Sequence, residues 1–150
     1  MRTVLGIVLV VQFSGCLAHL AKPKPADLTA LKSANETYLK MVRWNDLRGA
    51  AQLVAPERRI DFLKPIIEAK EDENLKVLEY EVEDAQADGD KATVLDKLIW
   101  HRLPSVTTKT DAVTTRWEAR GSTWFIVAIE GGPLTLEKAA PTPAAGAGAP

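Results

Sequence analysis

The apolar residues of this chain change their spacing once, close to Asn74. Before that point they recur every three or four residues, as on one face of a helix, and Leu31, Tyr38 and Val42 follow this period. After it, apolar and polar residues alternate, which is the period of a strand with one buried face. A chain with helices first and strands afterwards is typical of the α+β class, in which helices cover one face of an antiparallel sheet.

Three helices are expected before the change of period. The first covers residues 27–43, and Asn45 is expected to cap a short second helix. Pro56 is expected to open the third, which should bend or restart at Pro65, because a proline inside a helix removes a hydrogen bond. The predicted apolar face of the first helix is formed by Leu28, Leu31, Ala34, Tyr38, Met41 and Val42. The predicted buried face of the third is formed by Ile60, Leu63 and Ile67.

The first expected hairpin has "LKVLEYEVED" and "KATVLDKLIWHRL" on either side of a turn at Asp88-Gly89, a strong short-range hairpin signal. With this dipeptide as the turn, the facing pairs are Tyr80 with Lys97, Val82 with Leu95, and Leu78 with Ile99. Glu81 would then lie against Asp96 on a polar face, where like charges are tolerable only in water or beside a cation.

The second expected hairpin, "DAVTTRWEARGSTWFIVAIE", turns at Arg120-Gly121 and brings Trp117 opposite Trp124. This pair would fix the register, because a slip by one residue would move both tryptophans to the other face. The predicted fold is therefore α+β, with three N-terminal helices packed on a curved four-stranded antiparallel sheet.

Composition excludes several classes of function. Lys and Arg (19) almost balance Asp and Glu (20), so the chain has no basic field for nucleic acid. One cysteine and two histidines give no spacing typical of a zinc site, and neither a phosphate-binding glycine loop nor a "GxSxG" motif is present. We expect no metal, no cofactor and no nucleic-acid partner.

The single cysteine, Cys16, follows an apolar segment at residues 4–13 that comes after Arg2. This segment is shorter than the roughly 20 residues that cross a bilayer, and it suits a secretory signal. "FSGC" resembles the lipobox of bacterial lipoproteins, with Phe13 where leucine is most common. The resemblance implies cleavage before Cys16 and acylation of its thiol. Two alternatives stay open: a plain secreted protein with a stray thiol, and a buried N-terminal segment.

The lipobox resemblance implies a signal peptide at residues 1–15 and a lipid-anchored tether at 16–26. The composition of residues 134–150, rich in Ala, Pro and Gly, predicts a disordered tail, which leaves a folded domain at 27–133. Several acyl chains would hold the protein firmly on a membrane. Leu17, rather than an aspartate, follows the cysteine, which by enteric-type sorting rules implies the periplasmic face of the outer membrane in the bacterial cell envelope.

Residues 26–130 resemble the nuclear-transport-factor-2-like superfamily, the cone-shaped cystatin-like folds that include ketosteroid isomerases and polyketide-cyclase-like proteins. The resemblance rests on "YLKMVRWNDLRGAAQLVAPERR", "EDAQADGDKATV" and "TTRWEARGSTWFIVAI". It implies a pocket between the helices and a concave sheet, and a homodimer formed through the sheet. These segments are signals of fold and not of catalysis.

Family enzymes place an acid, a histidine or a tyrosine inside the cone, where apolar surroundings shift pKa values. Tyr38 and His101 are the weak catalytic candidates here, although each residue type in such a position is more commonly structural. A set of arginines would form an anion-binding patch if they converged: Arg58, Arg59, Arg116 and Arg120.

The favoured function is a non-enzymatic envelope lipoprotein whose domain binds an apolar small molecule or an envelope protein. The alternatives are a tethered isomerase-like or cyclase-like enzyme acting on an apolar substrate, and a structural subunit of an envelope assembly. Substitution of Tyr38 and His101 separates the first two, because an enzyme should lose turnover and keep its fold.

Mass analysis of the intact protein, purified from the membrane of a bacterial host, tests the anchor. We expect a mature chain that begins at Cys16 and carries added acyl mass, because the lipobox directs both steps. A Cys16→Ser variant should lose that mass. An unmodified chain in the soluble fraction would contradict the lipoprotein prediction.

Overall fold

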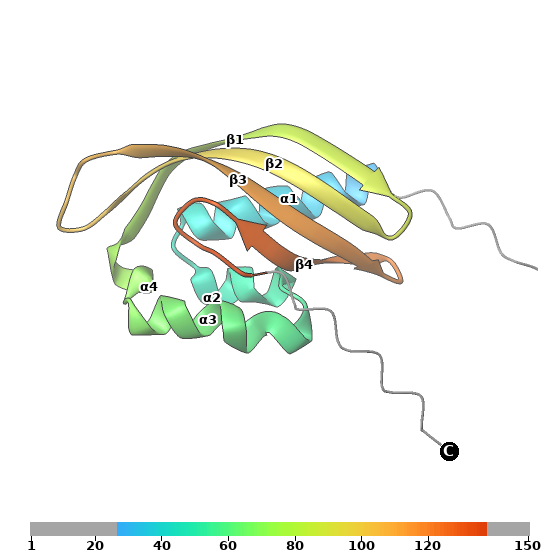
Figure 1. Ribbon diagram of the computed structural model, residues 1–150, viewed down its shortest axis with the longest axis horizontal. Coiled ribbons are helices and arrows are strands. Elements are labelled where there is room, and N and C mark those ends of the chain that lie inside the picture. Colours follow the sequence, from blue (N-terminus) through green and yellow to red (C-terminus); the bar gives the residue numbers. More distant parts are fainter. Residues whose placement is uncertain (1–26, 138–150) are drawn as a thin grey trace, which may run out of the picture.

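The computed structural model of this chain describes residues 27–137 (Figure 1). It confirms the α+β class and the four-stranded antiparallel sheet, whose strand order is β1-β2-β3-β4. The helices are α1 (Leu28–Arg43), α2 (Leu47–Ala50), α3 (Arg59–Glu68) and α4 (Glu71–Asn74), with 3-10 turns η1 (Ala51–Leu53) and η2 (Pro56–Arg58). The strands are β1 (Leu75–Asp88), β2 (Lys91–Arg102), β3 (Lys109–Arg120) and β4 (Thr123–Glu130).

The predicted signal peptide, the predicted lipidation site Cys16, the predicted tether and nearly all of the predicted tail lie outside the described residues. Within residues 27–137, no helix has the length and the apolar composition that crossing a membrane requires.

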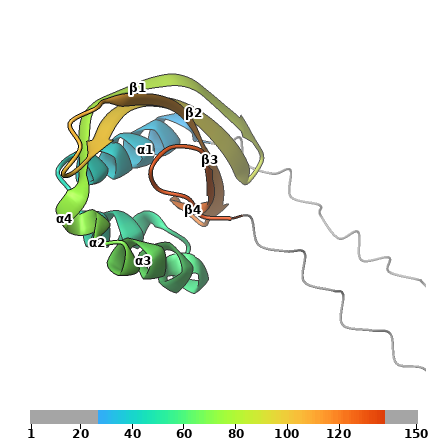
Figure 2. The ribbon, with the colours of Figure 1, turned by 60° about the vertical axis from the view of Figure 1, so that its left-hand side comes forward.

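The sheet arches over α1, and α2 and α3 lie beneath β4 (Figures 1 and 2). Asp27 caps α1, because its carboxylate accepts hydrogen bonds from the backbone N–H groups of Thr29 and Ala30. The buried face of α1 consists of Leu31, Asn35, Tyr38, Leu39 and Val42. Leu28, which was predicted to share this face, is 43% exposed because it lies at the very start of the helix.

The predicted buried face of the third helix is wrong at two of its three residues, because only Leu63 packs against the core, where it is partly buried. Ile60 is 78% exposed and Ile67 is 53% exposed, whereas Phe62 and Ile66 are 1% and 4% exposed. Both sets of residues have helical spacing, so the period alone does not decide which one faces the core. Nor does α3 restart at Pro65, which lies inside the continuous helix Arg59–Glu68.

The predicted cap of the second helix is displaced by one residue. Asp46 is the N-cap of α2, and its carboxylate accepts a hydrogen bond from the Gly49 N–H at 2.9 Å. Asn45 instead has a positive φ of 61°, a conformation that asparagine tolerates better than most residues.

The first hairpin has a different register from the predicted one. Its turn is Gly89-Asp90, because Asp88 pairs with Lys91. Two β-bulges in β1 then shift the register at Leu78 and at Glu83. The observed pairs are Tyr80 with Leu98, Glu81 with Lys97, and Val82 with Asp96. The expected contact between Glu81 and Asp96 is therefore absent, and the Lys97 Nζ lies 3.6 Å from a Glu81 carboxylate oxygen instead.

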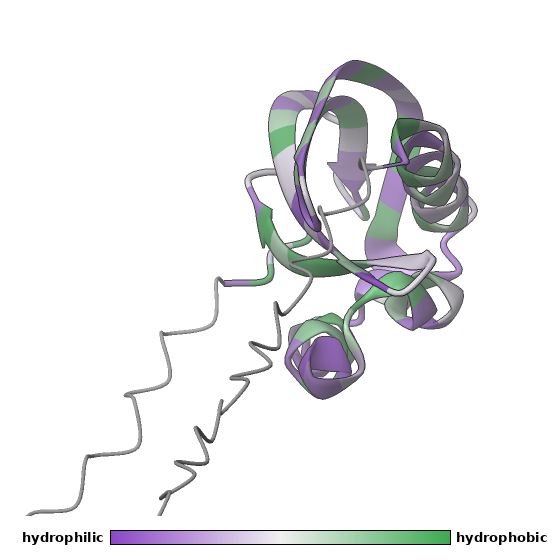
Figure 3. Ribbon diagram, turned by 90° about the vertical axis from the view of Figure 1, so that its right-hand side faces the viewer, coloured by the Kyte–Doolittle hydropathy of each residue, from purple (hydrophilic) through white to green (hydrophobic). Residues whose placement is uncertain are grey.

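The second hairpin is also offset. Arg120 pairs with Thr123, so that Trp124 lies opposite Ala119, and Trp117 lies opposite Ile126. Both tryptophans remain buried, as neighbours along one face of the sheet and not as a facing pair. Figure 3 shows the alternation of hydrophobic and hydrophilic residues along the strands that keeps this face in the core.

The core continues beyond Pro133. Leu134 and Leu136 are 5% and 2% exposed, and Leu136 exchanges two backbone hydrogen bonds with Ile129 of β4. Near the other end of β4, Val54 forms a parallel bridge with Ile126. These two short segments therefore occupy parts of the outer edge of β4.

Truncation of the buried and exposed residues of α3 tests its orientation. Phe62→Ala should lower the free energy of unfolding by about 3–5 kcal/mol, because it removes a fully buried aromatic ring. Ile60→Ala, the control on the exposed face, should change it by less than about 0.5 kcal/mol. Urea unfolding followed by circular dichroism measures both, and equal losses would contradict this orientation.

Candidate functional site

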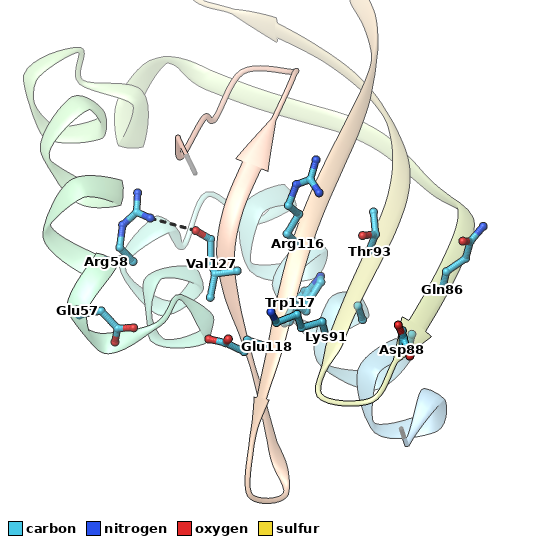
Figure 4. Close-up of a pocket in the computed structure, with 12 residues that line it drawn as sticks. Glu57, Arg58, Gln86, Asp88, Lys91, Thr93, Arg116, Trp117, Glu118 and Val127 are labelled. Atoms are coloured by element: carbon cyan, nitrogen blue, oxygen red, sulfur yellow. Dashed lines mark hydrogen bonds between the residues drawn. The ribbon is translucent and has the colours of Figure 1, made fainter. Parts of the chain in front are cut away.

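An open groove of about 680 Å³ lies on the described part of the chain, residues 27–137 (Figure 4). This volume lies within the range of small-molecule sites. Thr93, Arg116 and Glu118 line it. They alternate along β2 and β3 with buried residues such as Val94 and Trp117, so they project from the face of the sheet that is turned away from the core.

The two ends of the groove differ in charge. Figure 4 shows Arg58 and Arg116 on either side of Val127 at one end, with Glu57 and Glu118 toward the other end. The groove is assembled from η2 and all of the strands, which is why residues distant in the sequence meet there.

Arg58 is held rigidly at the wall of the groove. Its side chain is only 13% exposed, its Nε donates to Asp61 at 3.0 Å, and its Nη1 donates to the Val127 carbonyl at 3.3 Å. Its Nη2 donates to the carbonyl of Glu137. This guanidinium thus joins η2 to β4 and to the chain after it.

Arg116 is the more available cation. Its Nε donates to Glu130 at 3.0 Å, and its side chain is 42% exposed. A guanidinium has five N–H donors, so most of those of Arg116 are left for a ligand. Lys91, at the other end of the groove, has no ion-pair partner within 4.0 Å among the residues that the structure describes.

Glu57 and Glu118, two of the three acidic residues that line the groove, are paired with Arg120. Its Nη1 donates to Glu57 at 2.9 Å, its Nη2 donates to the other oxygen of Glu57, and Glu118 lies 3.4 Å from the same Nη2. The hydrogen bonds from Arg120 lower the pKa of Glu57 to about 2. This carboxylate therefore stays ionised and paired through the whole physiological range of pH.

Of the four arginines that could form an anion-binding patch, Arg58 and Arg116 line the same groove. Arg120 is engaged with the two glutamates at its rim. Arg59 does not join them, because it donates to the carbonyls of Val54 at 3.2 Å and Gln52 at 3.0 Å. The patch is thus only partly assembled.

Tyr38 and His101, the catalytic candidates from the sequence, lie on different sides of the sheet. Tyr38 is 4% exposed on the buried face of α1, and burial together with the charge of Asp96 raises its pKa above the ordinary value. Trp100 is buried, so the next residue, His101, projects from the opposite face of β2. The His101 Nδ1 is 2.9 Å from the Ser105 carbonyl. The structure does not bring the two candidates together.

A buried polar pair, Asn35 of α1 and Asp96 of β2, was missed in the sequence. The Asn35 Nδ2 donates to the Asp96 Oδ1 at 2.9 Å, and the two residues are 1% and 0% exposed. Desolvation, as the largest cause, raises the pKa of Asp96 to about 6. The sequence did indicate that Asp96 is buried, because Asp96 shares the two-residue period of Val94 and Leu98, which are both buried.

Within residues 27–137, no three His, Cys, Asp or Glu side chains are grouped so that they could hold a metal ion. The groove is open to solutes, whereas the pair is sealed from them.

No protein-family model matches this chain, and no curated protein matches it. Among solved structures, the chain is similar to the solution structure of a SEC-C motif containing protein from Rhodopseudomonas palustris, with 19% sequence identity and a TM-score of 0.52. The likeness covers 67% of this chain and 74% of that chain. At this level of identity it shows a shared fold and nothing about ligand or activity.

Replacing Arg120 tests whether its hydrogen bonds keep the Glu57 carboxylate ionised at the rim of the groove. In an Arg120→Gln variant, the pKa of Glu57 should rise from about 2 toward the ordinary value near 4.3, because its main hydrogen-bond donor is lost. Carboxyl ¹³C NMR titration measures the pKa. An Arg48→Gln variant, which changes an exposed side chain of α2, should leave the pKa of Glu57 unaltered, and an unaltered value in both variants would refute the assignment.

Proposed function

We propose that this protein is a lipid-anchored module of the bacterial cell envelope that binds a small molecule in the groove beside Arg116, without catalysis. The observation that carries the proposal is the groove itself, which has the volume of a ligand site and presents a partly exposed guanidinium with unused donors. The resemblance of "FSGC" to a lipobox supports the anchor, and Leu17 after the cysteine, in place of an aspartate, supports the outer-membrane location.

The fold within this proposal is the nuclear-transport-factor-2-like cone. The position of α1 beneath the arch of the sheet supports it (Figure 2), as do the sequence segments that resemble the family. The groove, however, lies on the face of the sheet turned away from α1, and not between α1 and the sheet where the family resemblance implies a pocket.

The chemistry of the groove favours a ligand with a carboxylate and an apolar body. Arg116 can bind a carboxylate with two parallel hydrogen bonds. Val127 lies beside it, and Ala87 also lines the cavity, and both are partly exposed, so the groove contributes some apolar contact as well as charge. Glu57 and Glu118 at the opposite end are already paired with Arg120, which limits their repulsion of an anion.

Two observations favour binding over the isomerase or cyclase alternative. Tyr38 and His101 lie on opposite faces of the sheet, so they cannot act on one substrate. Asp96, whose pKa is raised to about 6, is 0% exposed and lies outside the groove. The envelope-protein partner, the role as an assembly subunit and the homodimer through the sheet stay predictions.

Binding of a matched pair of probes tests the ligand class. We expect 1-naphthylacetate to bind the full-length chain at least tenfold more tightly than neutral 1-naphthylacetamide, because a charge-assisted hydrogen bond is worth about 1.5–3 kcal/mol. Arg116→Gln should abolish that preference, and Arg48→Gln should retain it. Ligand-observed NMR measures all three proteins.

Equal affinity for the two probes in the unaltered protein would overturn the ligand class. Binding of neither probe would overturn the small-molecule proposal and leave a protein partner as the better hypothesis. Because these measurements concern the groove alone, they are independent of the result for Cys16.

A further inference from the structure

Asn35 and Asp96 join α1 to the sheet from within the core. Asn35 lies in the second turn of α1, and Asp96 lies near the middle of β2. Their hydrogen bond of 2.9 Å connects residues 61 positions apart, and both side chains are almost completely removed from solvent. A polar contact at this depth influences how firmly the helix is held on the sheet.

The pair is incomplete when Asp96 is ionised. The Asn35 Oδ1 and the Asp96 Oδ2 are buried and have no hydrogen-bond partner among residues 27–137. Both atoms are acceptors, so neither can satisfy the other. A buried polar atom without a partner is destabilising, and a buried charge without a cation is more so.

One proton would satisfy both atoms. A protonated carboxyl group gains an O–H donor, and an amide oxygen is a suitable acceptor. With the existing bond from Asn35 Nδ2 to Asp96 Oδ1, a second bond from Asp96 Oδ2 to Asn35 Oδ1 would close a two-bond ring between the side chains.

We propose that Asp96 is protonated in the folded protein and donates to the Asn35 Oδ1, forming an acid–amide pair that holds α1 on the sheet and weakens as pH rises. The proposal concerns the folding of the domain and does not depend on the ligand of the groove or on the anchor at Cys16.

The two carboxylates near Asp96, Glu36 of α1 and Glu83 of β1, both raise its pKa. Tyr38 of α1 is also nearby and is uncharged, because burial and the charge of Asp96 raise the pKa of its hydroxyl group. The residue opposite Asp96 on β3 is Val113, which carries no charge, and the residue opposite on β1 is Val82. Burial is the largest influence on the pKa of Asp96, and the two glutamates raise it further to about 6, against the opposing effect of the Asn35 hydrogen bond.

The nearby lysines do not compensate for this charge. Lys40 lies 3.6 Å from Glu36, and Lys97 lies 3.6 Å from Glu81. Lys97 is also the neighbour of Asp96 along β2, so its side chain leaves the strand on the opposite face.

The sign of the pH dependence follows from the raised pKa. Since the folded protein binds this proton more tightly than the unfolded chain, its contribution to stability is complete below the unfolded pKa of about 3.9 and is lost as pH rises through about 6. This is the reverse of the usual behaviour of a carboxylate in an ion pair. Between pH 5 and pH 8, the folding equilibrium constant should fall about tenfold from this group alone.

Urea unfolding of the full-length chain at pH 5 and pH 8, at constant ionic strength, tests the proposal. Asp96→Asn places an N–H donor where the acid would have its O–H, so this variant should lose the tenfold pH dependence and be more stable than the unaltered protein at pH 8. Asp90→Asn makes the same chemical change in the exposed Gly89-Asp90 turn, and it should keep the full dependence.

An Asp96→Asn variant that retains the pH dependence would overturn the proposal. If that variant does not fold, carboxyl ¹³C NMR of the unaltered protein decides instead. A midpoint near pH 6 for Asp96 supports the acid–amide pair. A midpoint at or below the ordinary value near 3.9 would show an ionised carboxylate whose second oxygen is satisfied in another way, and would overturn it.

Discussion

The packing of α1 against the inner face of the sheet is the contact on which the rest of this structure depends. Leu31, Leu39 and Val42 are at most 2% exposed and form the apolar part of that contact. The long hairpin of β1 and β2 has to bend to cover the helix, and the bulges at Leu78 and Glu83 occur in the strand that bends. Without the helix, the inner face of this hairpin would be open to water.

Local patterns in the sequence predicted the class of fold well and the pairing of residues poorly. The change of period near Asn74 marks the boundary at which β1 begins, at Leu75. The registers failed because the turn is displaced by one residue and β1 contains two extra residues, Leu78 and Glu83. Each bulge residue repeats the type of one neighbour, in Val77-Leu78 and in Glu83-Asp84, so the alternation is interrupted at both bulges and this signal was overlooked.

Local patterns also failed to predict which side chains of α3 are buried and on which face of β2 Asp96 lies. Helical spacing gives α3 two apolar stripes, and only contact with the rest of the core selects the one that contains Phe62 and Ile66. Asp96 was assigned to a polar face by a register that was one residue in error. Its period with Val94 and Leu98 was the better guide, since the alternation within one strand does not depend on pairing.

The groove could not have been derived from any one segment. Arg58 precedes α3 and Arg116 lies on β3, and only the tertiary fold brings them to one cavity. In the sequence they were two of several arginines with no sign of convergence. Arg58 is less available to a ligand than Arg116. This difference also follows from contacts between distant parts of the chain, such as the hydrogen bond from Arg58 to the carbonyl of Val127.

The covered edge at β4 and the irregular edge at β1 limit how copies of this protein can associate through their sheets. On β4, Val54 and Leu136 occupy backbone positions to which a strand from a neighbouring molecule could otherwise bind. On β1, the irregular backbone at Leu78 and Glu83 and the exposed acidic side chains on either side oppose the regular pairing of a second strand. The domain is thereby protected from edge-to-edge aggregation, a property of value to any protein that is crowded together with its own copies.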